Sequence, residues 1–362
     1  MTTNPLVPVP AAGPVVQPTT PPRPRRPSNE EIAAWVLIGG LVIYILMMHV
    51  VAALVGGLAL YLILDRLAQA FSKRIPGTAA RPLAVILVAL VGGGIIIGSV
   101  ALSISFMRHH VDRLPAMMTQ MADILQSTRA WLGDSGQQLI PEVLTDAENI
   151  KAAAVDWLKR HADTLKIAGG TFGIGLIHLI MGMLLALLVF FRHVTHHDYA
   201  PRGALADALT EKVDRFTRSF SQIATAQIKI SAANTLLTAL YLFVLLPLFG
   251  KHLPFSTTIV IVTFVCGLIP ILGNLISNTV IVILSLGISF GTAIASLAFL
   301  VVIHKLEYLI NSRIVGGETD SQAWEILLAI LVGETAFGVA GVVMAPIVYA
   351  FVKRELRERG LV

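Results

Sequence analysis

The stretch that decides the fold is Leu253–Ile303, which reads LPFSTTIVIVTFVCGLIPILGNLISNTVIVILSLGISFGTAIASLAFLVVI. It contains no Asp, Glu, Lys or Arg. A helix that crosses the hydrocarbon core of a bilayer needs about 20 apolar residues. The stretch is therefore too long for one crossing and too apolar for the surface of a soluble domain. It predicts helices that lie within a membrane.

The composition of the whole chain agrees with this interpretation. Of its 362 residues, 55% are hydrophobic and 14% are charged, against about 25% charged in an average soluble domain. The net charge of +5 would suit a nucleic-acid partner. In a membrane protein, however, cationic cytoplasmic loops explain such an excess, and no nucleic-acid partner is expected. The one cysteine, Cys266, is interpreted as a small apolar filler.

Apolar runs elsewhere in the chain predict an all-α fold, a polytopic transmembrane helical bundle of about eight crossings. Besides Leu253–Ile303, these runs are Ile32–Leu64, Pro82–Phe106, Ile167–Phe191, Ile230–Gly250 and Ile326–Val352. Ile32–Leu64 is expected to cross twice as a short hairpin, and Leu253–Ile303 is also expected to cross twice. Three crossings within Leu253–Ile303 would instead require a re-entrant segment elsewhere, for which Gly333–Gly341 is the candidate.

Positive charge in the short loops predicts the orientation, because Lys and Arg are enriched on the cytoplasmic side. Arg66, Lys73, Arg74 and Arg81 share one loop, which is expected to be cytoplasmic, as are both termini. The predicted organisation is a Pro-rich, disordered cytoplasmic tail (1–29), N-terminal membrane helices (30–106), a small extracytoplasmic helical insert (107–166), a membrane helix (167–191), a cytoplasmic amphipathic helix (192–222), a C-terminal membrane domain (223–352) and a basic cytoplasmic tail (353–362).

A helix break within the longest apolar run is the first candidate functional feature. Pro270 has no amide hydrogen for a helical hydrogen bond, and Gly273 permits backbone conformations closed to other residues. Together with Asn274 and Asn278, they predict a broken helix whose freed backbone groups could line a transport path. The alternative is a plain loop that joins two crossings at the cytoplasmic surface.

Ionisable and polar side chains at the edges of the apolar runs form the second set of candidates, because such groups are costly inside a membrane. Glu334 lies within the last run, either as a coupling group or in the polar turn of a re-entrant segment. His304 and Glu307 are three residues apart on one helical face, where they could relay protons, bind a cation or form an interfacial salt bridge. Lys229 is expected to extend to the interface, and the alternative is that Gln227 and Lys229 face a solute.

Motifs of enzymes and pumps are missing from the sequence. It has no Walker loop, no dinucleotide fingerprint, no G-x-S-x-G nucleophile elbow and no His-Glu-x-x-His zinc helix. His193, His196 and His197 lack a nearby cysteine and are interpreted as solvated rather than as a metal site. We therefore expect no enzyme activity, no cofactor and no metal, and any transport would be secondary or passive.

Short motifs in the C-terminal half resemble those of one transporter family. They are Gly267–Gly273 (GLIPILG), Glu307, Arg313–Gly316 (RIVG), Gly338–Gly341 (GVAG), and Ala345 with Pro346. In this order and spacing, they resemble the autoinducer-2 exporter (AI-2E) family of bacterial permeases over about residues 30–355. The resemblance implies export of small polar signalling molecules in some members, cation/proton antiport in others, and homo-oligomers, possibly pentamers.

The sequence therefore leads to one functional hypothesis and two alternatives. The hypothesis is a multi-pass secondary transporter of a bacterial inner membrane that exports a small polar solute. The first alternative is a monovalent cation/proton antiporter. The second, from another class, is a non-transporting membrane scaffold that assembles partners through residues 107–166.

Overall fold

The computed structural model describes residues 27–75, 79–110, 114–132, 146–195, 203–269, 272–319 and 321–361. Throughout these ranges the regular structure is helical, with no strand, as the all-α prediction requires. Pro270, His196, His197 and most of the predicted N-terminal tail lie outside the described residues.

The first apolar run forms two helices, α1 (Asn29–Met47) and α2 (Val51–Ser72). α1 begins with a capping box in which Ser28 and Glu31 satisfy each other's backbone amides. A tight turn separates the helices, and His49 adopts a left-handed conformation there with φ of 56°. The run thus contains two helices, and its two crossings stay a prediction.

The middle of the chain contains two long apolar helices and a smaller helical pair. These are α3 (Ala80–His110), α4 (Leu114–Leu132), α6 (Ala147–Arg160) and α7 (Ala162–Thr195). α4 packs against α6, within the segment predicted as a helical insert. α2 packs along α7, where Gly182 lies so close to Ala53 that a Cβ atom on the glycine would overlap the Ala53 carbonyl.

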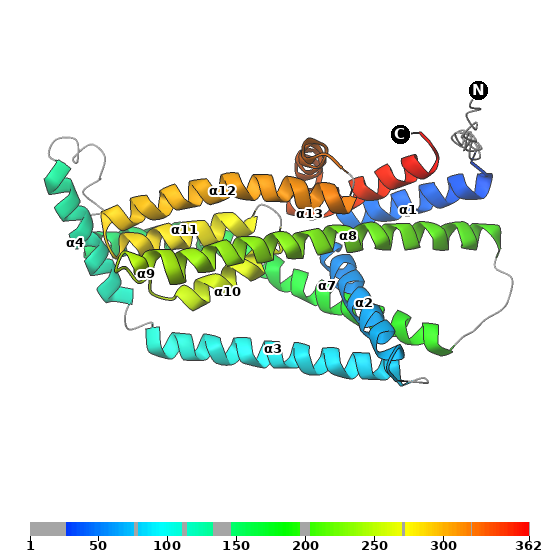
Figure 1. The fold of residues 1–362 in the computed structure, drawn as a ribbon, viewed down its shortest axis with the longest axis horizontal. Coiled ribbons are helices and arrows are strands. Elements are labelled where there is room, and N and C mark those ends of the chain that lie inside the picture. Colours follow the sequence, from blue (N-terminus) through cyan, green and yellow to red (C-terminus); the bar gives the residue numbers. More distant parts are fainter. Residues whose placement is uncertain are drawn as a thin grey trace, which may run out of the picture.

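Four helices in the C-terminal half form a ring in which each helix packs against two others. α8 (Ala204–Leu240) contacts α10 (Ser256–Gly267) and α12 (Phe290–Thr319), and α11 (Leu272–Leu286) completes the ring between α10 and α12. We call this arrangement the four-helix ring. Figure 1 shows α8 extending beyond it, past α13 and beside α1. The predicted boundary between 192–222 and 223–352 falls inside the continuous helix α8.

α8 continues into a π-helical turn, η3 (Tyr241–Leu245), and a last short turn, α9 (Leu246–Leu248). Pro247 explains the irregularity. It lacks the amide that would bond to the carbonyl of Phe243, and its ring would clash with that carbonyl in a regular α-helix. The wider π turn relieves this clash, and π turns within helices frequently occur at functional sites.

The last helix, α13 (Ala323–Glu358), reverses direction within its length. Gly338 has φ of 59° and ψ of −141°, a combination that favours glycine. Gly341 lies against Gly333, and Lys353 Nζ is 2.5 Å from Glu325 Oε2. In a straight helix, residues 28 positions apart would be about 42 Å apart. α13 is therefore a helical hairpin with its apex at Gly338.

The hairpin apex lies within Gly333–Gly341, the candidate for a re-entrant segment. The run Leu253–Ile303 supplies three helices, and α10 and α11 have 12 and 15 residues. Their lengths of about 18 and 22 Å fall short of a hydrocarbon core of about 30 Å. The first arm of α13, up to Gly338, is similarly short. A single straight crossing over Ile326–Val352 is wrong, because the chain turns back.

Within the described ranges, five helices are long and apolar enough to cross a membrane: Asn29–Met47, Val51–Ser72, Ala162–Arg192, Ala204–Leu248 and Trp324–Glu358. The last of these is the hairpin, so it is not one straight span. Four shorter apolar helical stretches, in α3, α10, α11 and α12, add to them. The chain is a multi-pass membrane protein, and the count of eight crossings stays a prediction.

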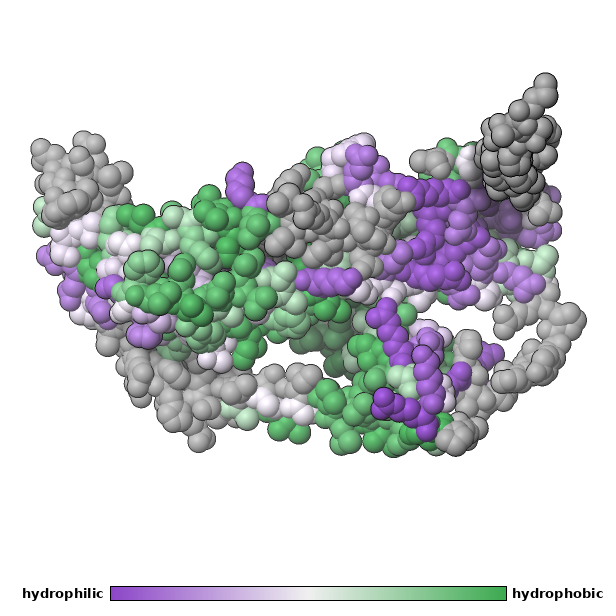
Figure 2. All heavy atoms as spheres, in the orientation of Figure 1, coloured by the Kyte–Doolittle hydropathy of each residue, from purple (hydrophilic) through white to green (hydrophobic). Residues whose placement is uncertain are grey.

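The surface divides in a way that suits a bilayer. In the face shown in Figure 2, hydrophobic residues cover α9 to α12, and hydrophilic residues gather over the N-terminal half of α8 and the end of α13. Many large apolar side chains are exposed, among them Leu236, Leu248 and Phe249. Such exposure would be costly in water and is favourable against lipid.

Candidate functional site

The interior of the four-helix ring contains a row of buried polar side chains that carry no formal charge. They are Ser231, Asn234 and Thr238 from α8, Thr263 from α10, Ser277 and Ser285 from α11, and Thr292 and Ser296 from α12. The three on α8 are spaced three and four residues apart, which places them on one face. Burial of polar groups is costly unless they are hydrogen-bonded. We call this set the polar ring interior.

One end of the polar ring interior is fixed to the end of α10. The last four carbonyls of a helix have no partner within the helix. Ser231 Oγ donates to the Phe264 carbonyl at 2.6 Å, and Gln227 Nε2 donates to the Gly267 carbonyl at 2.7 Å. The amides of Leu268 and Ile269 bond to the two carbonyls between them. All four carbonyls are therefore satisfied, two of them by side chains of α8.

The contact between α8 and α10 is also close. A Cβ atom on Gly267 would lie 2.7 Å from Ser231 Oγ, nearer than real Cβ contacts occur. Glycine at this position therefore allows the two helices to approach and the side-chain bonds to form. The GLIPILG motif thus begins at the point where α8 holds the end of α10.

The other end of the polar ring interior is a chain of three buried hydroxyls. Tyr241 Oη and Ser296 Oγ are 2.6 Å apart, and Ser296 Oγ and Ser285 Oγ are also 2.6 Å apart. The Tyr241 ring stacks on Phe299 with centroids 3.8 Å apart. These contacts join the π turn of α8 to α11 and α12. The hydroxyl chain therefore connects three of the four helices at the end of the ring opposite Gln227.

The predicted site residues separate into several places. Gln227 lies at the ring, as described above. Lys229 is exposed, two residues further along α8 and on another face. Glu334 is exposed on α13, one turn before the hairpin apex. The helix break is present between α10 and α11, which end and begin at Gly267 and Leu272.

The remaining predicted residues at the break and on α12 are only partly described. Gly273 and Asn274 lie in the first turn of α11, and Glu307 lies in α12. The side chains of Asn274 and Glu307 are outside the described structure. The pairing of Glu307 with His304 therefore stays a prediction.

Asn278 and His304 are brought together, although outside the ring rather than within it. They line a groove of about 470 Å³ between α11 and α12. Its other lining residues are Thr279, Val282, Ile283, Leu297, Leu300, Val301 and Lys305. Ser277 and Ser296, which face into the ring, do not line it. We call this feature the outer groove.

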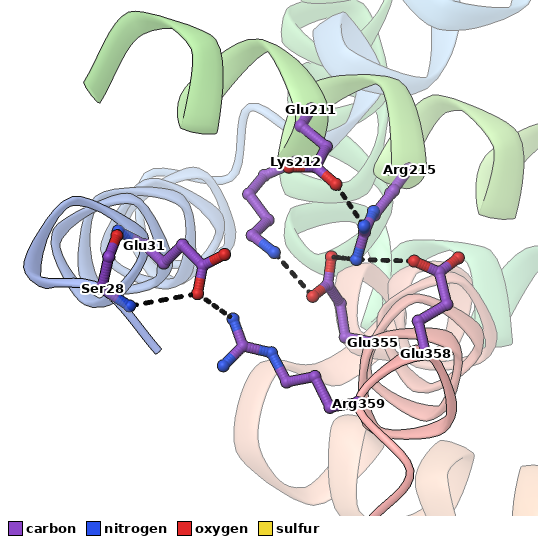
Figure 3. A network of polar contacts seen from close by, with 8 residues as sticks. All are labelled: Ser28, Glu31, Glu211, Lys212, Arg215, Glu355, Glu358 and Arg359. Atoms are coloured by element: carbon purple, nitrogen blue, oxygen red, sulfur yellow. Dashed lines mark hydrogen bonds and ion pairs between the residues drawn. The ribbon is translucent and has the colours of Figure 1, made fainter. Parts of the chain in front are cut away.

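A buried ionic cluster between α8 and α13 was not predicted from the sequence. Glu355 is 0% exposed and Lys212 is 2% exposed, and their Oε2 and Nζ atoms are 2.7 Å apart. Arg215 Nη1 lies 2.9 Å from Glu355 Oε1 and 2.7 Å from Glu358 Oε2. Figure 3 shows these side chains pointing toward one another, with Glu211 joining Arg215 from its own helix. We call this set the ionic cluster.

The ionic cluster also reaches α1. Lys212 Nζ lies 5.4 Å from the centre of the Trp35 ring, and Arg359 Nη2 lies 3.3 Å from Glu31 Oε2. The sequence does carry a signal for the cluster. Lys212 and Arg215 are three residues apart on one helical face, as are the acids Glu355 and Glu358 on α13, a spacing that makes two complementary charged patches.

Metal binding has no support from the part of the chain that the structure describes. No group of three or more His, Cys, Asp or Glu side chains there is placed to hold a metal ion. The chemistry available at the polar ring interior is instead hydrogen bonding by hydroxyls and amides. Such groups can bind and release a polar molecule without a covalent step.

Comparisons with known proteins point the same way. A sequence profile described as "AI-2E family transporter" matches residues 32–358. A curated relative from Bacillus subtilis (strain 168), named "Putative transport protein YdbI", is 22% identical over 189 residues. That alignment covers 50% of this chain and 51% of the relative, so the chain spans about half of the relative's length. No solved structure matches the chain.

Proposed function

The chain belongs to the AI-2E family of transporters, and from that premise we propose that it is a secondary transporter that exports a small, neutral, polar solute. The observation that supports this proposal is the polar ring interior. Its eight buried hydroxyl and amide side chains carry no formal charge. A solute with hydroxyl or amide groups can exchange its hydrogen bonds with water for bonds with these side chains.

In the described state, Gln227 and Ser231 donate to carbonyls at the end of α10, and Tyr241, Ser296 and Ser285 are bonded in a chain. Solute passage therefore requires some of these bonds to exchange. The bonds proposed to exchange with the solute are those from Gln227 and Ser231 to the end of α10. They hold a short helix next to a chain break, and such breaks line the solute sites of many transporters. A solute that competes for these donors would release the α10–α11 hairpin from α8.

The polar ring interior favours solute export over the antiporter alternative. Exchange of a cation for a proton needs an ionisable group on the path. Among the described side chains inside the ring, none is a carboxylate, an amine or an imidazole. The scaffold alternative leaves the buried polar groups without a role. The proposal includes a homo-oligomer in an inner membrane with both termini cytoplasmic, which light scattering in detergent and terminal reporter fusions would test.

A flux experiment tests the proposed function. Metabolites exported by cells with and without the protein are compared to identify a solute, and its efflux from proteoliposomes is then measured. Ser231→Ala removes one bond to α10 and is expected to reduce efflux at least several-fold while the chain still inserts. Ser127→Ala is the matched control, because this exposed hydroxyl on α4 bonds only within its own helix. Equal efflux by the parent and by Ser231→Ala would contradict the proposed path.

A further inference from the structure

The outer groove lies on the outer face of the four-helix ring. On α11, the buried side chains Ser277, Ile281 and Ser285 face into the ring, whereas Thr279 and Ile283 are exposed. On α12, Leu297 and Val301 are exposed in the same way. The groove is therefore separate from the polar ring interior and faces the surroundings of the protein, which are lipid along these apolar helices.

The lining of the outer groove changes from apolar to cationic along its length. Val282, Ile283, Leu297, Leu300 and Val301 form the apolar part. His304 and Lys305 stand at one end, with the amide and hydroxyl of Asn278 and Thr279 on the facing helix. Among the described lining residues, none is a carboxylate. Among the described side chains, none forms an ion pair with Lys305.

The cationic end also lies where a lipid headgroup would lie. α12 is free of charged residues from Phe290 to Ile303, and His304 and Lys305 are the first basic side chains after this run. From Leu297 to Lys305 the helix rises about 12 Å, close to half of a hydrocarbon core of about 30 Å. The groove therefore has the depth of one leaflet, with its charge at the water boundary.

We propose that the outer groove binds an anionic glycerophospholipid. One acyl chain would lie against Leu297 and Val301, and the phosphate would pair with Lys305 and His304. Asn278 and Thr279 are placed to bond to the glycerol or ester oxygens. Residues 192–222, which include the start of α8, are predicted to be cytoplasmic, and α12 runs from Ser296, beside Tyr241 at the far end of α8, back toward that start (Figure 1). This lipid would therefore belong to the cytoplasmic leaflet, where basic pockets between membrane helices bind anionic headgroups. A volume of about 470 Å³ is ordinary for a ligand site.

A lipid-binding measurement tests this proposal without any transport assay, so its failure would be distinct from failure of the proposed function. The full-length chain in detergent is titrated with phosphatidylglycerol or with phosphatidylcholine of the same acyl chains, and bound lipid is counted by native mass spectrometry. We expect tighter binding of phosphatidylglycerol. Lys305→Gln should weaken that binding about fivefold, the effect of one basic side chain near an anionic headgroup.

Two further variants and one competitor complete the design. Lys73→Gln changes an exposed lysine outside the groove and should leave lipid binding unchanged. Val301→Trp fills the apolar part and should abolish the phosphatidylglycerol adduct. Free glycerol 3-phosphate should not compete, because it lacks an acyl chain. Equal binding of both lipids, unchanged binding by Lys305→Gln, or competition by glycerol 3-phosphate would overturn the proposal. It would also be overturned if Val301→Trp dissociated an oligomer but still bound lipid, because the groove would then be a contact between copies of the chain.

Discussion

Glu355→Gln is the substitution whose consequence follows most directly from the structure. Both carboxylate oxygens of Glu355 are engaged, one by Lys212 Nζ at 2.7 Å and one by Arg215 Nη1 at 2.9 Å. A glutamine at this position would leave the Lys212 ammonium, only 2% exposed, without its counter-charge. Removal of one partner from a buried ion pair costs about 3–5 kcal/mol.

Three remaining contacts set the size of the effect within that range. Lys212 keeps the Trp35 ring at 5.4 Å, a cation–π contact that is worth about 0.5–2 kcal/mol. Arg215 keeps Glu358 and Glu211, so its own charge remains compensated. We therefore expect Glu355→Gln to lower the free energy of unfolding by about 3 kcal/mol, near the lower end of the range.

The assay is an equilibrium unfolding titration of the purified chain in detergent, followed by tryptophan fluorescence. Glu358→Gln is the matched control, because this glutamate also pairs with Arg215 but is 45% exposed, and such pairs contribute about 0–1 kcal/mol. The double variant Lys212→Met/Glu355→Leu removes both buried charges and should recover most of the loss. Equal losses in the two Gln variants, or no recovery in the double variant, would refute the reasoning.

Other predictions concern the hairpin and the hydroxyl chain. Gly341→Ala should destabilise the protein by about 1–3 kcal/mol, because its Cβ would overlap the Gly333 carbonyl across the hairpin. Gly39→Ala is the control, because a Cβ atom at Gly39 would meet open space. Equal unfolding midpoints for the two variants would contradict the close packing at Gly341. Tyr241→Phe should cost about 1 kcal/mol, because it removes the bond to buried Ser296. Tyr44→Phe, at an exposed tyrosine, should cost almost nothing in the same titration, and an equal cost would count against the hydroxyl chain.

Several predictions from the sequence depend on features that are local along the chain, and these are confirmed. The charge-free run Leu253–Ile303 predicted helices within a membrane because its composition alone excludes a water-exposed surface. Pro270 and Gly273 predicted a helix break, and a break lies between the end of α10 at Gly267 and the start of α11 at Leu272, although Gly273 itself lies inside α11. The family resemblance rested on short motifs in a fixed order, and the profile match over residues 32–358 confirms it.

The candidate site was harder to predict, because lipid changes what a hydrophobic pattern means. In a soluble helix, the apolar face marks the interior. In a membrane helix, both the interior and the lipid-facing surface are apolar, so the pattern does not separate them. Asn278 and Ser277 are neighbours with similar polarity, yet one lines the outer groove and the other lies in the polar ring interior.

The sequence by itself therefore determined the helical class, the membrane environment, the break near Pro270 and the family, because each depends on composition or on residues near one another in the chain. Only the tertiary structure decided which distant groups meet. Lys212 and Glu355 are 143 positions apart, and Gln227 and Gly267 are 40 apart. Such pairs form only when α8 packs against α13 and α10, and helix packing is a property of the whole fold.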